Sequence, residues 1–247
     1  MNKRLAYAIP NIFTALSLIC ALVALNLASN NEFIQAAWVL TLSLLLDGLD
    51  GKMARLLKAT SKIGAEADSL ADFAAFGVVP GFLSWQVGLK HLGLIGFIVF
   101  VFYIICGGYR LARYNVITHN PNKKENFLGL PIPAAAAAIC SFILFNEIIL
   151  RDYDGYIILL LIMILMGFLM ISHVPYIAVN KSYKKKKQIS VISFLIATIA
   201  ILAIKYTVWV YLITIWLYVL YGMVNFTILA FSRHNTKDYY IKNRKGL

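Results

Sequence analysis

The sequence predicts an all-α integral membrane protein, a polytopic helical bundle of about eight transmembrane helices. Of its 247 residues, 61% are hydrophobic and only 14% are charged, whereas soluble domains carry about 25% charged residues. Apolar runs near the ~20 residues that cross the hydrocarbon core recur along the whole chain. So few charges could not cover so much apolar surface, which excludes a single water-soluble globule. Disorder and a disulfide scaffold are excluded with it.

The predicted spans follow one another with short polar connections. They cover residues 8–28, 33–57, 65–86, 91–114, 131–150, 156–179, 189–204 and 207–231. The seventh is short. The third begins with acidic residues, but its length and its flanking loops favour a span. None of these long runs alternates with the period of two that a membrane β-strand requires.

Basic residues are distributed unequally between the two sides of the predicted membrane. With the N-terminus inside, only Lys90, Arg151 and Lys205 of the 23 lysines and arginines lie outside. This bias predicts that both termini are cytoplasmic. The net charge of +12 then reflects cytoplasmic loops and anionic lipid headgroups, so no nucleic-acid partner is expected.

Acidic residues concentrate in one short stretch of the chain. Five of the 11 acidic residues fall between positions 47 and 72. Ionisable groups in or near a span are costly and generally mark function. Aspartates and small residues recur on one face of each of two successive helices: Asp47, Asp50, Gly51 and Ala54, then Gly64, Asp68 and Asp72. Arg55 lies at the edge of the first face, whereas Lys52 and Glu66 point away.

The connection between these two helices is short, so we expect antiparallel neighbours whose four aspartates meet at the cytoplasmic end. Carboxylates brought together repel one another, and bound cations remove that repulsion. Oxygen ligands without His or Cys nearby select hard ions such as Mg²⁺, Mn²⁺ or Ca²⁺. Four aspartates are enough for a two-metal site of the kind that holds a transferring phosphoryl group.

Two other readings of this stretch are open. A salt-bridge cluster with Lys52, Arg55, Lys58 and Lys62 would nearly balance the acids, but ion pairing needs no regular spacing. A cation transporter would use the acids as an ion path, which predicts acids placed deeper and on several helices. The small residues Gly51, Ala54 and Gly64 provide clearance for a bulky ligand, close helix packing, or both.

The same stretch resembles a known family. The pattern Asp47-x2-Asp50-Gly51-x2-Ala54-Arg55-x8-Gly64-x3-Asp68-x3-Asp72 matches the complete signature of the CDP-alcohol phosphatidyltransferases, eight fixed residues over 26 positions. The resemblance implies a six-helix core over residues 1–180, usually a homodimer, with a dinuclear metal site at the cytoplasmic membrane face. Residues 181–247 would add two helices and a basic cytoplasmic tail. The implied reaction moves a phosphatidyl-type group from a CDP-activated lipid to an alcohol and releases CMP.

The resemblance also implies roles for individual residues. Asp47, Asp50 and Asp68 would bind Mg²⁺ or Mn²⁺, and Asp72 would complete the metal site and act as general base. The pocket for the nucleotide and the CDP-lipid would consist of Asn11, Thr14, Gly51, Ala54, Arg55 and Gly64. For Asn11 and Thr14 the alternative is an ordinary helix start, with Pro10 in the first turn.

Three further stretches resemble the serine-dependent branch of the family, the membrane-embedded CDP-diacylglycerol–serine O-phosphatidyltransferases. They are residues 9–14, residues 61–80, and residues 107–115 with 127–133, and the likeness covers roughly residues 6–180. It implies CDP-diacylglycerol and L-serine as substrates and a bacterial inner membrane as the location. Glycerol 3-phosphate and an inositol phosphate are the alternative acceptors. The sequence offers no Ser/His or Cys/His pair for a covalent intermediate, so we expect direct attack.

Two arginines are candidates for binding the acceptor or a phosphate. Arg110 and Arg113 are three residues apart near the inner end of the fourth span, so they share a helix face. One of them is expected to receive the serine carboxylate or the lipid phosphate. Snorkelling to lipid headgroups is the alternative. Lys62 and Lys123 are weaker candidates for the same task.

Overall fold

The computed structural model describes residues 3–57, 62–118, 129–150, 155–172, 174, 207–225 and 227. These residues form helices and short connections, and no strand occurs among them. Within this part of the chain, six helices are long and apolar enough to cross a membrane: Pro10–Ser29, Phe33–Asp50, Gly64–Val87, Leu89–Val116, Ile132–Leu150 and Thr207–Asn225. The predicted all-helical, membrane-integral class is confirmed.

The helices follow the predicted spans closely. They are α1 (Lys3–Ser29), α2 (Phe33–Leu57), α3 (Lys62–Asp72), α4 (Val79–Val87), α5 (Gly93–Thr118), α6 (Ile132–Phe145) and α7 (Gly155–Ile171). The apolar helix α7 covers the first part of the predicted sixth span and is shorter than the spanning helices. The predicted span 189–204 lies outside the described residues, so the number of eight stays a prediction.

Several predicted spans are built from more than one helical segment. A π-helical turn, Phe73–Val78, joins α3 to α4 and makes one long span of the three. A second π-helical turn, Asn146–Leu150, extends α6, and a 3₁₀ turn, Leu89–Leu92, precedes α5. The apolar run and its length predict each of these spans, including the third, which begins with the acidic residues of α3. Hydropathy gives no indication of the changes of helical pitch.

The first helix begins earlier than expected. It starts at Lys3 and includes Pro10 in its interior, so the alternative of an ordinary helix start at Pro10 is wrong. Proline lacks the backbone N–H and removes one bond of the helical ladder. The Thr14 hydroxyl donates a hydrogen bond to the Pro10 carbonyl at 3.3 Å. Thr14 and Asn11 therefore lie on a continuous helix.

A tight antiparallel pair is formed by α1 and α2. Small side chains line the contact and are fully buried: Ala21, Ala24, Ala28, Ala36 and Ala37. Two serines bond reciprocally across it, because the Ser43 hydroxyl donates to the Ser17 carbonyl at 2.8 Å and the Ser17 hydroxyl to the Ser43 carbonyl at 3.1 Å. Close packing through small residues is the usual way in which membrane helices associate.

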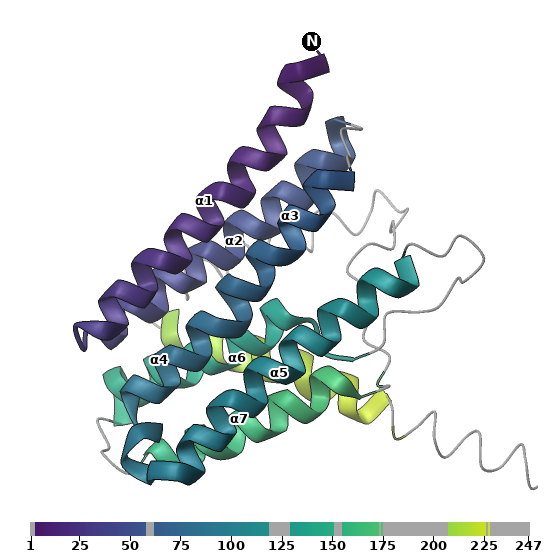
Figure 1. Ribbon diagram of the computed structural model, residues 1–247. Coiled ribbons are helices and arrows are strands. Elements are labelled where there is room, and N and C mark those ends of the chain that lie inside the picture. Colours follow the sequence, from purple (N-terminus) through teal and green to yellow (C-terminus); the bar gives the residue numbers. More distant parts are fainter. Residues whose placement is uncertain are drawn as a thin grey trace, which may run out of the picture.

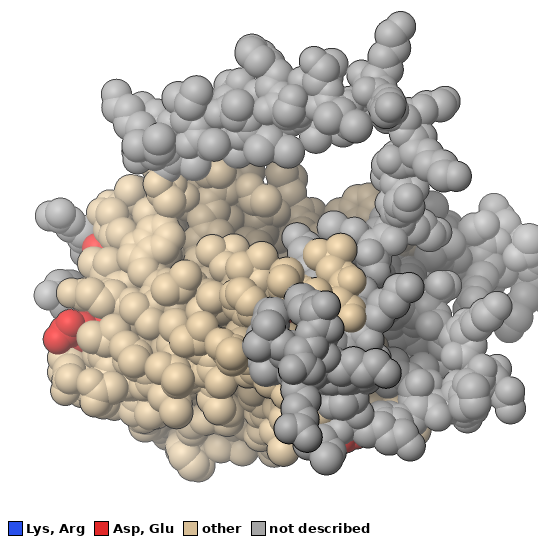
Figure 2. Space-filling model, turned by 90° about the horizontal axis from the view of Figure 1, so that it is seen from above, with Lys and Arg blue, Asp and Glu red and all other residues tan. Residues whose placement is uncertain are grey.

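The remaining helices complete a bundle around α6. In Figure 1, α3 and α4 run alongside α1, while α5 and α7 cross the lower half of the molecule. The side chains of α6 are buried almost throughout, from Ala135 to Leu144. Large apolar side chains are exposed on the outer helices, for example Leu45, Leu70 and Leu94. The view from above in Figure 2 shows few charged side chains among the described residues.

Candidate active site

Three aspartates from two helices converge on one point. Asp47 and Asp50 come from α2 and Asp68 from α3, and one carboxylate oxygen of each lies within 4.8 Å of the others. Asp50 is buried, and Asp47 and Asp68 are half-buried. The helical spacing of the sequence predicts this convergence, and the structure brings the three side chains together.

The fourth aspartate belongs to the same cluster. Asp72 lies one turn after Asp68 on α3, and its carboxyl group forms a side-chain hydrogen bond with that of Asp47. It also interacts electrostatically with Asp68 and Asp50. Two carboxyl groups can share a hydrogen bond only when one of them carries a proton. The four groups therefore form a compact acidic centre that protons or cations must compensate.

The donor set of this centre fits a hard divalent cation. The Asp68 Oδ1 atom is buried and has no hydrogen-bond partner among the described residues. A buried carboxylate oxygen without a partner is costly, and a cation would satisfy it. Every ligand atom in the cluster of Asp47, Asp50 and Asp68 is a carboxylate oxygen, which is the ligand type that Mg²⁺, Mn²⁺ and Ca²⁺ prefer.

Thr14 orients one of these carboxylates. Its hydroxyl donates a hydrogen bond of 2.8 Å to Asp50 Oδ2, so α1 contributes directly to the acidic centre on α2 and α3. The sequence places Thr14 in the nucleotide pocket, and the structure shows that it contacts a carboxylate of the cluster. Asn11, its neighbour one turn earlier on α1, is exposed.

The two arginines on α5 have different surroundings. Arg110 is 7% exposed, interacts electrostatically with Asp72, Tyr114 and Tyr218, and has its guanidinium carbon 5.9 Å from the centre of the Tyr114 ring. It therefore lies beside the acidic centre.

Arg113 is bonded to the end of α7 instead. Its guanidinium donates to the carbonyls of Ile171 at 3.0 Å, Ser172 at 3.1 Å and Met170 at 3.4 Å. The last carbonyls of a helix have no partner within the helix, so Arg113 satisfies them and ties α5 to α7. Sequence spacing puts the two arginines on one face, but it does not distinguish these two environments.

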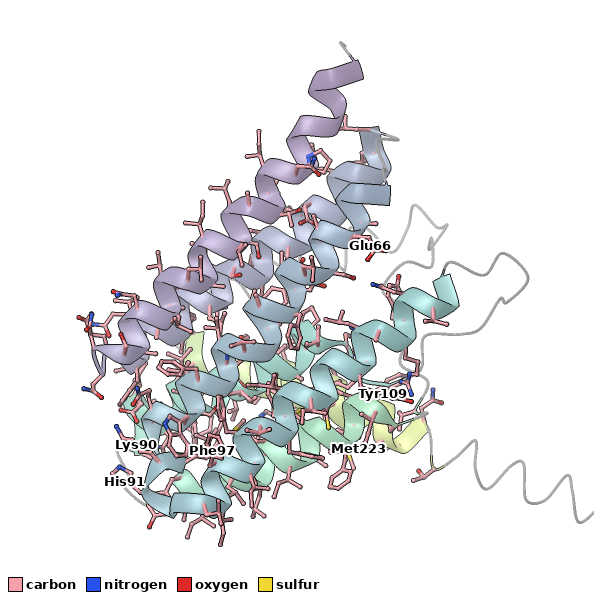
Figure 3. All side chains as sticks on the ribbon, viewed as in Figure 1. Glu66, Lys90, His91, Phe97, Tyr109 and Met223 are labelled. Carbon is pink, nitrogen blue, oxygen red and sulfur yellow. The ribbon has the colours of Figure 1, made fainter. Side chains whose placement is uncertain are left out.

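The structure describes the side chains of only some of the other predicted site residues. Gly64 is half-buried on α3. Glu66 is exposed, and Figure 3 shows its side chain projecting from α3. The remaining residues have side chains outside the described part of the structure: Gly51, Ala54, Arg55, Lys62 and Lys123.

The sequence does not predict one polar pair that lies next to the acidic centre along α3. The Ser69 hydroxyl and the Asn115 amide bond each other, with Ser69 Oγ 3.1 Å from Asn115 Oδ1 and 3.0 Å from Asn115 Nδ2. Ser69 follows Asp68 on α3, and Asn115 lies on α5. The pair bonds α3, which carries Asp68 and Asp72, to α5, which carries Arg110. Both residues lie in family-like stretches, but spacing gives no signal for a contact across 46 positions.

Comparison with known proteins accords with this geometry. A family model described as CDP-alcohol phosphatidyltransferase matches residues 7–164, which is more than half of the chain and includes all four aspartates. The chain belongs to the CDP-alcohol phosphatidyltransferase family. It is thus an integral membrane enzyme of the transferase class, and its family acts in phospholipid biosynthesis.

Several curated relatives are named CDP-diacylglycerol–serine O-phosphatidyltransferase. The protein of Helicobacter pylori strain 26695 is 39% identical over 182 residues, covering 73% of this chain and 75% of the relative. The Methanocaldococcus jannaschii protein is 34% identical over 168 residues, covering 68% and 73%. The Bacillus subtilis protein is 37% identical over 145 residues, covering 58% and 79%.

Proposed function

We propose that this enzyme transfers the phosphatidyl group of CDP-diacylglycerol to the hydroxyl of L-serine, giving phosphatidylserine and CMP. The observation that carries the proposal is the juxtaposition of the four-aspartate centre and the buried cation of Arg110. The names of the relatives support CDP-diacylglycerol and serine as the substrates. The family assignment supports the reaction type.

The carboxylates of Asp47, Asp50, Asp68 and Asp72 would hold divalent cations, Mg²⁺ or Mn²⁺, and four of them suffice for two ions. Bound there, the cations would supply positive charge that neutralises the diphosphate of the CDP-lipid and the leaving CMP. Thr14 fixes the orientation of the Asp50 carboxylate through its 2.8 Å hydrogen bond. Outer-shell bonds of this type hold ligands in the geometry that binding requires.

Asp72 is the proposed general base. Its carboxylate accepts the proton of the serine hydroxyl while the serine oxygen attacks the β-phosphorus, the one that bears the diacylglycerol. A new phosphorus–oxygen bond forms to serine, and the bond from that phosphorus to the bridging oxygen of CMP breaks. The electron pair of the broken bond leaves with CMP. Direct displacement needs no covalent enzyme intermediate.

Arg110 is the proposed binding group for the acceptor carboxylate or the lipid phosphate. It lies beside Asp72, so an anion held by its guanidinium would have its hydroxyl close to the base. The planar guanidinium binds carboxylates and phosphates in a bidentate manner. Arg113 is engaged with the carbonyls of α7, which makes Arg110 the better candidate of the two.

The setting of the reaction is part of the proposal. The basic bias of the loops supports an active site at the cytoplasmic face of a bacterial inner membrane. There the lipid stays in the bilayer while its headgroup meets a water-soluble acceptor. The family resemblance also supports a homodimer and a division into a core over 1–180 and an extension over 181–247. It further supports a pocket for the nucleotide and the CDP-lipid that consists of Asn11, Thr14, Gly51, Ala54, Arg55 and Gly64.

CMP release by the purified protein tests the proposal. Protein in detergent is supplied with CDP-diacylglycerol and Mn²⁺ or Mg²⁺, and CMP is measured with serine, glycerol 3-phosphate, inositol phosphate or no acceptor. Release that only serine stimulates and EDTA abolishes supports the proposal. Stimulation by another alcohol overturns the acceptor and keeps the chemistry. If no condition releases CMP, the next measurement is cation flux in liposomes.

A further inference from the structure

The span Gly64–Val87 changes its helical pitch directly after Asp72. The helix α3 ends at Asp72, and the six-residue π-helical turn Phe73–Val78 begins at the next residue. At the end of this turn the Val79 N–H bonds the Ala74 carbonyl, five residues earlier, whereas an α-helix would bond the carbonyl four residues earlier. Single π-helical turns within α-helices are rare and occur frequently at functional sites. This one adjoins the helix that carries two aspartates of the acidic centre.

Pro80 provides the physical reason for the turn. It is buried and lies in the first turn of α4. In an uninterrupted α-helix the N–H of residue 80 would bond the Phe76 carbonyl, but proline has no N–H and its ring collides with the carbonyl four residues earlier. The Phe76 carbonyl therefore lacks its α-helical partner. Because Phe76 is fully buried, this carbonyl needs a donor from elsewhere in the protein.

Tyr103 of α5 is that donor. Its hydroxyl donates a hydrogen bond of 3.0 Å to the Phe76 carbonyl, and its side chain is fully buried. A buried tyrosine hydroxyl usually has a hydrogen-bond partner, so one bond satisfies both groups. The turn also packs directly on α5, since a Cβ atom added at Gly108 would lie 3.2 Å from the Phe73 ring. The helix α5 thus supports the π-helical turn with a polar contact and an apolar contact.

The turn sets the rotation of α3 about its own axis. A turn bonded over five residues accommodates one residue more than an α-helical turn, and one residue rotates an α-helix by about 100°. If the turn became α-helical while α4 kept its place, α3 would rotate by about this angle. Asp68 and Asp72 would then turn away from the aspartates of α2. In the structure, by contrast, one carboxylate oxygen each of Asp47, Asp50 and Asp68 lies within 4.8 Å of the others.

We propose that Tyr103 is a positioning residue for the metal centre: its hydroxyl stabilises the π-helical turn and thereby holds Asp68 and Asp72 toward α2. The inference rests on the proposed function in assigning metal binding to these aspartates. Tyr103 acts through the backbone of the turn and needs no contact with the metal or a substrate. It therefore affects metal affinity through the rotation of α3.

The test combines two substitutions in the full-length protein. Tyr103→Phe removes the hydroxyl and keeps the ring. Pro80→Ala supplies an N–H that can bond the Phe76 carbonyl in an α-helix. Thermal unfolding in detergent and titration with Mn²⁺, followed by electron paramagnetic resonance of the free ion, are measured for both single variants and for the double variant. Ser84→Ala is the matched control, because the Ser84 hydroxyl is also buried and donates to a carbonyl of this span, that of Pro80, at 2.8 Å.

Tyr103→Phe should lower the unfolding temperature and weaken Mn²⁺ binding about three- to tenfold, the range expected for one lost hydrogen bond. In the double variant the new N–H should restore part of the unfolding temperature, but Mn²⁺ binding should weaken further because α3 rotates. Pro80→Ala alone should weaken Mn²⁺ binding less than the double variant, since Tyr103 still supports the π-helical turn. Ser84→Ala should lower the unfolding temperature and leave Mn²⁺ binding near wild type.

A purely structural role of Tyr103 gives a different pattern. Mn²⁺ binding would then recover together with the unfolding temperature in the double variant, and this result would overturn the proposal. Unchanged Mn²⁺ binding by Tyr103→Phe, or equal weakening by Ser84→Ala, would do the same. If Tyr103→Phe does not fold, Pro80→Ala decides, and wild-type Mn²⁺ affinity of that variant would count against the proposal.

Failure of the proposed function is distinguishable from failure of this inference. Mn²⁺ binding is measured without substrate, so CMP release with an alcohol other than serine overturns the acceptor and leaves the role of Tyr103 standing. A wild-type protein that binds no Mn²⁺ overturns the metal centre, and the inference with it. A wild-type protein that binds Mn²⁺, with variants that bind it equally well, overturns the inference alone.

Discussion

Replacing Thr14 with valine tests the acidic centre with minimal change of shape. Valine has nearly the shape of threonine but cannot donate the 2.8 Å hydrogen bond to Asp50 Oδ2. Asp50 is only 5% exposed, so water cannot readily replace the lost donor. A hydrogen bond to a charged group contributes about 1.5–3 kcal/mol, which corresponds to about a ten- to hundredfold change in an equilibrium constant.

The assay compares metal binding with turnover. Mn²⁺ is titrated against the detergent-solubilised protein while the signal of the free ion is followed by electron paramagnetic resonance, and CMP release is measured in parallel. We expect Thr14→Val to weaken Mn²⁺ binding about ten- to hundredfold, in line with losses seen when outer-shell partners of metal ligands are removed. Saturating Mn²⁺ should restore most of the turnover, because every carboxylate is still present.

Thr41→Val is the matched control for this experiment. Thr41 is also a half-buried threonine, but its hydroxyl bonds the Ala37 carbonyl at 2.8 Å and the Tyr211 hydroxyl. Its loss should leave Mn²⁺ binding unchanged. If Thr14→Val binds Mn²⁺ as tightly as wild type, Asp50 does not depend on this bond, and the reasoning from the geometry is refuted. Equal weakening by both variants would point to general loosening of the helix pair.

Three further predictions concern the base, the helix contacts and one turn. Asp72→Asn should lower CMP release at least about hundredfold while Mn²⁺ binding is partly kept; wild-type turnover would show that Asp72 is not the base. Arg113→Ala should reduce stability by about 1–3 kcal/mol because three carbonyls at the end of α7 lose their donor. Thermal unfolding should show this without a rise in the serine KM, and an altered serine KM with unaltered stability would contradict it. Gly129→Ala should also lower stability, since Gly129 has φ +84° and a Cβ atom there would collide with the Met170 carbonyl. Gly48→Ala is its control, with no atom within 4 Å of the added carbon, and equal unfolding temperatures for the two variants would refute the steric explanation.

The acidic centre shows what the spacing of residues along a helix can predict about a site. Asp47 and Asp50 on α2, and Asp68 and Asp72 on α3, are placed by the helical repeat alone, because residues three and four apart share a face. The same rule groups Arg110 with Arg113 on α5, yet one lies beside Asp72 and the other bonds α7. The repeat fixes the side of a helix. It does not fix what packs against that side.

The sequence by itself determined the membrane class, the positions of most helices and the residues of the acidic centre, because hydropathy and helical periodicity are local properties of the chain. Only the tertiary structure decided the bond from Thr14 to Asp50, the pairing of Ser69 with Asn115 and the attachment of Arg113 to the end of α7. These contacts join residues 36, 46 and 58 positions apart. Such contacts depend on how the helices pack, and the packing is set by the combined shape of all their buried side chains.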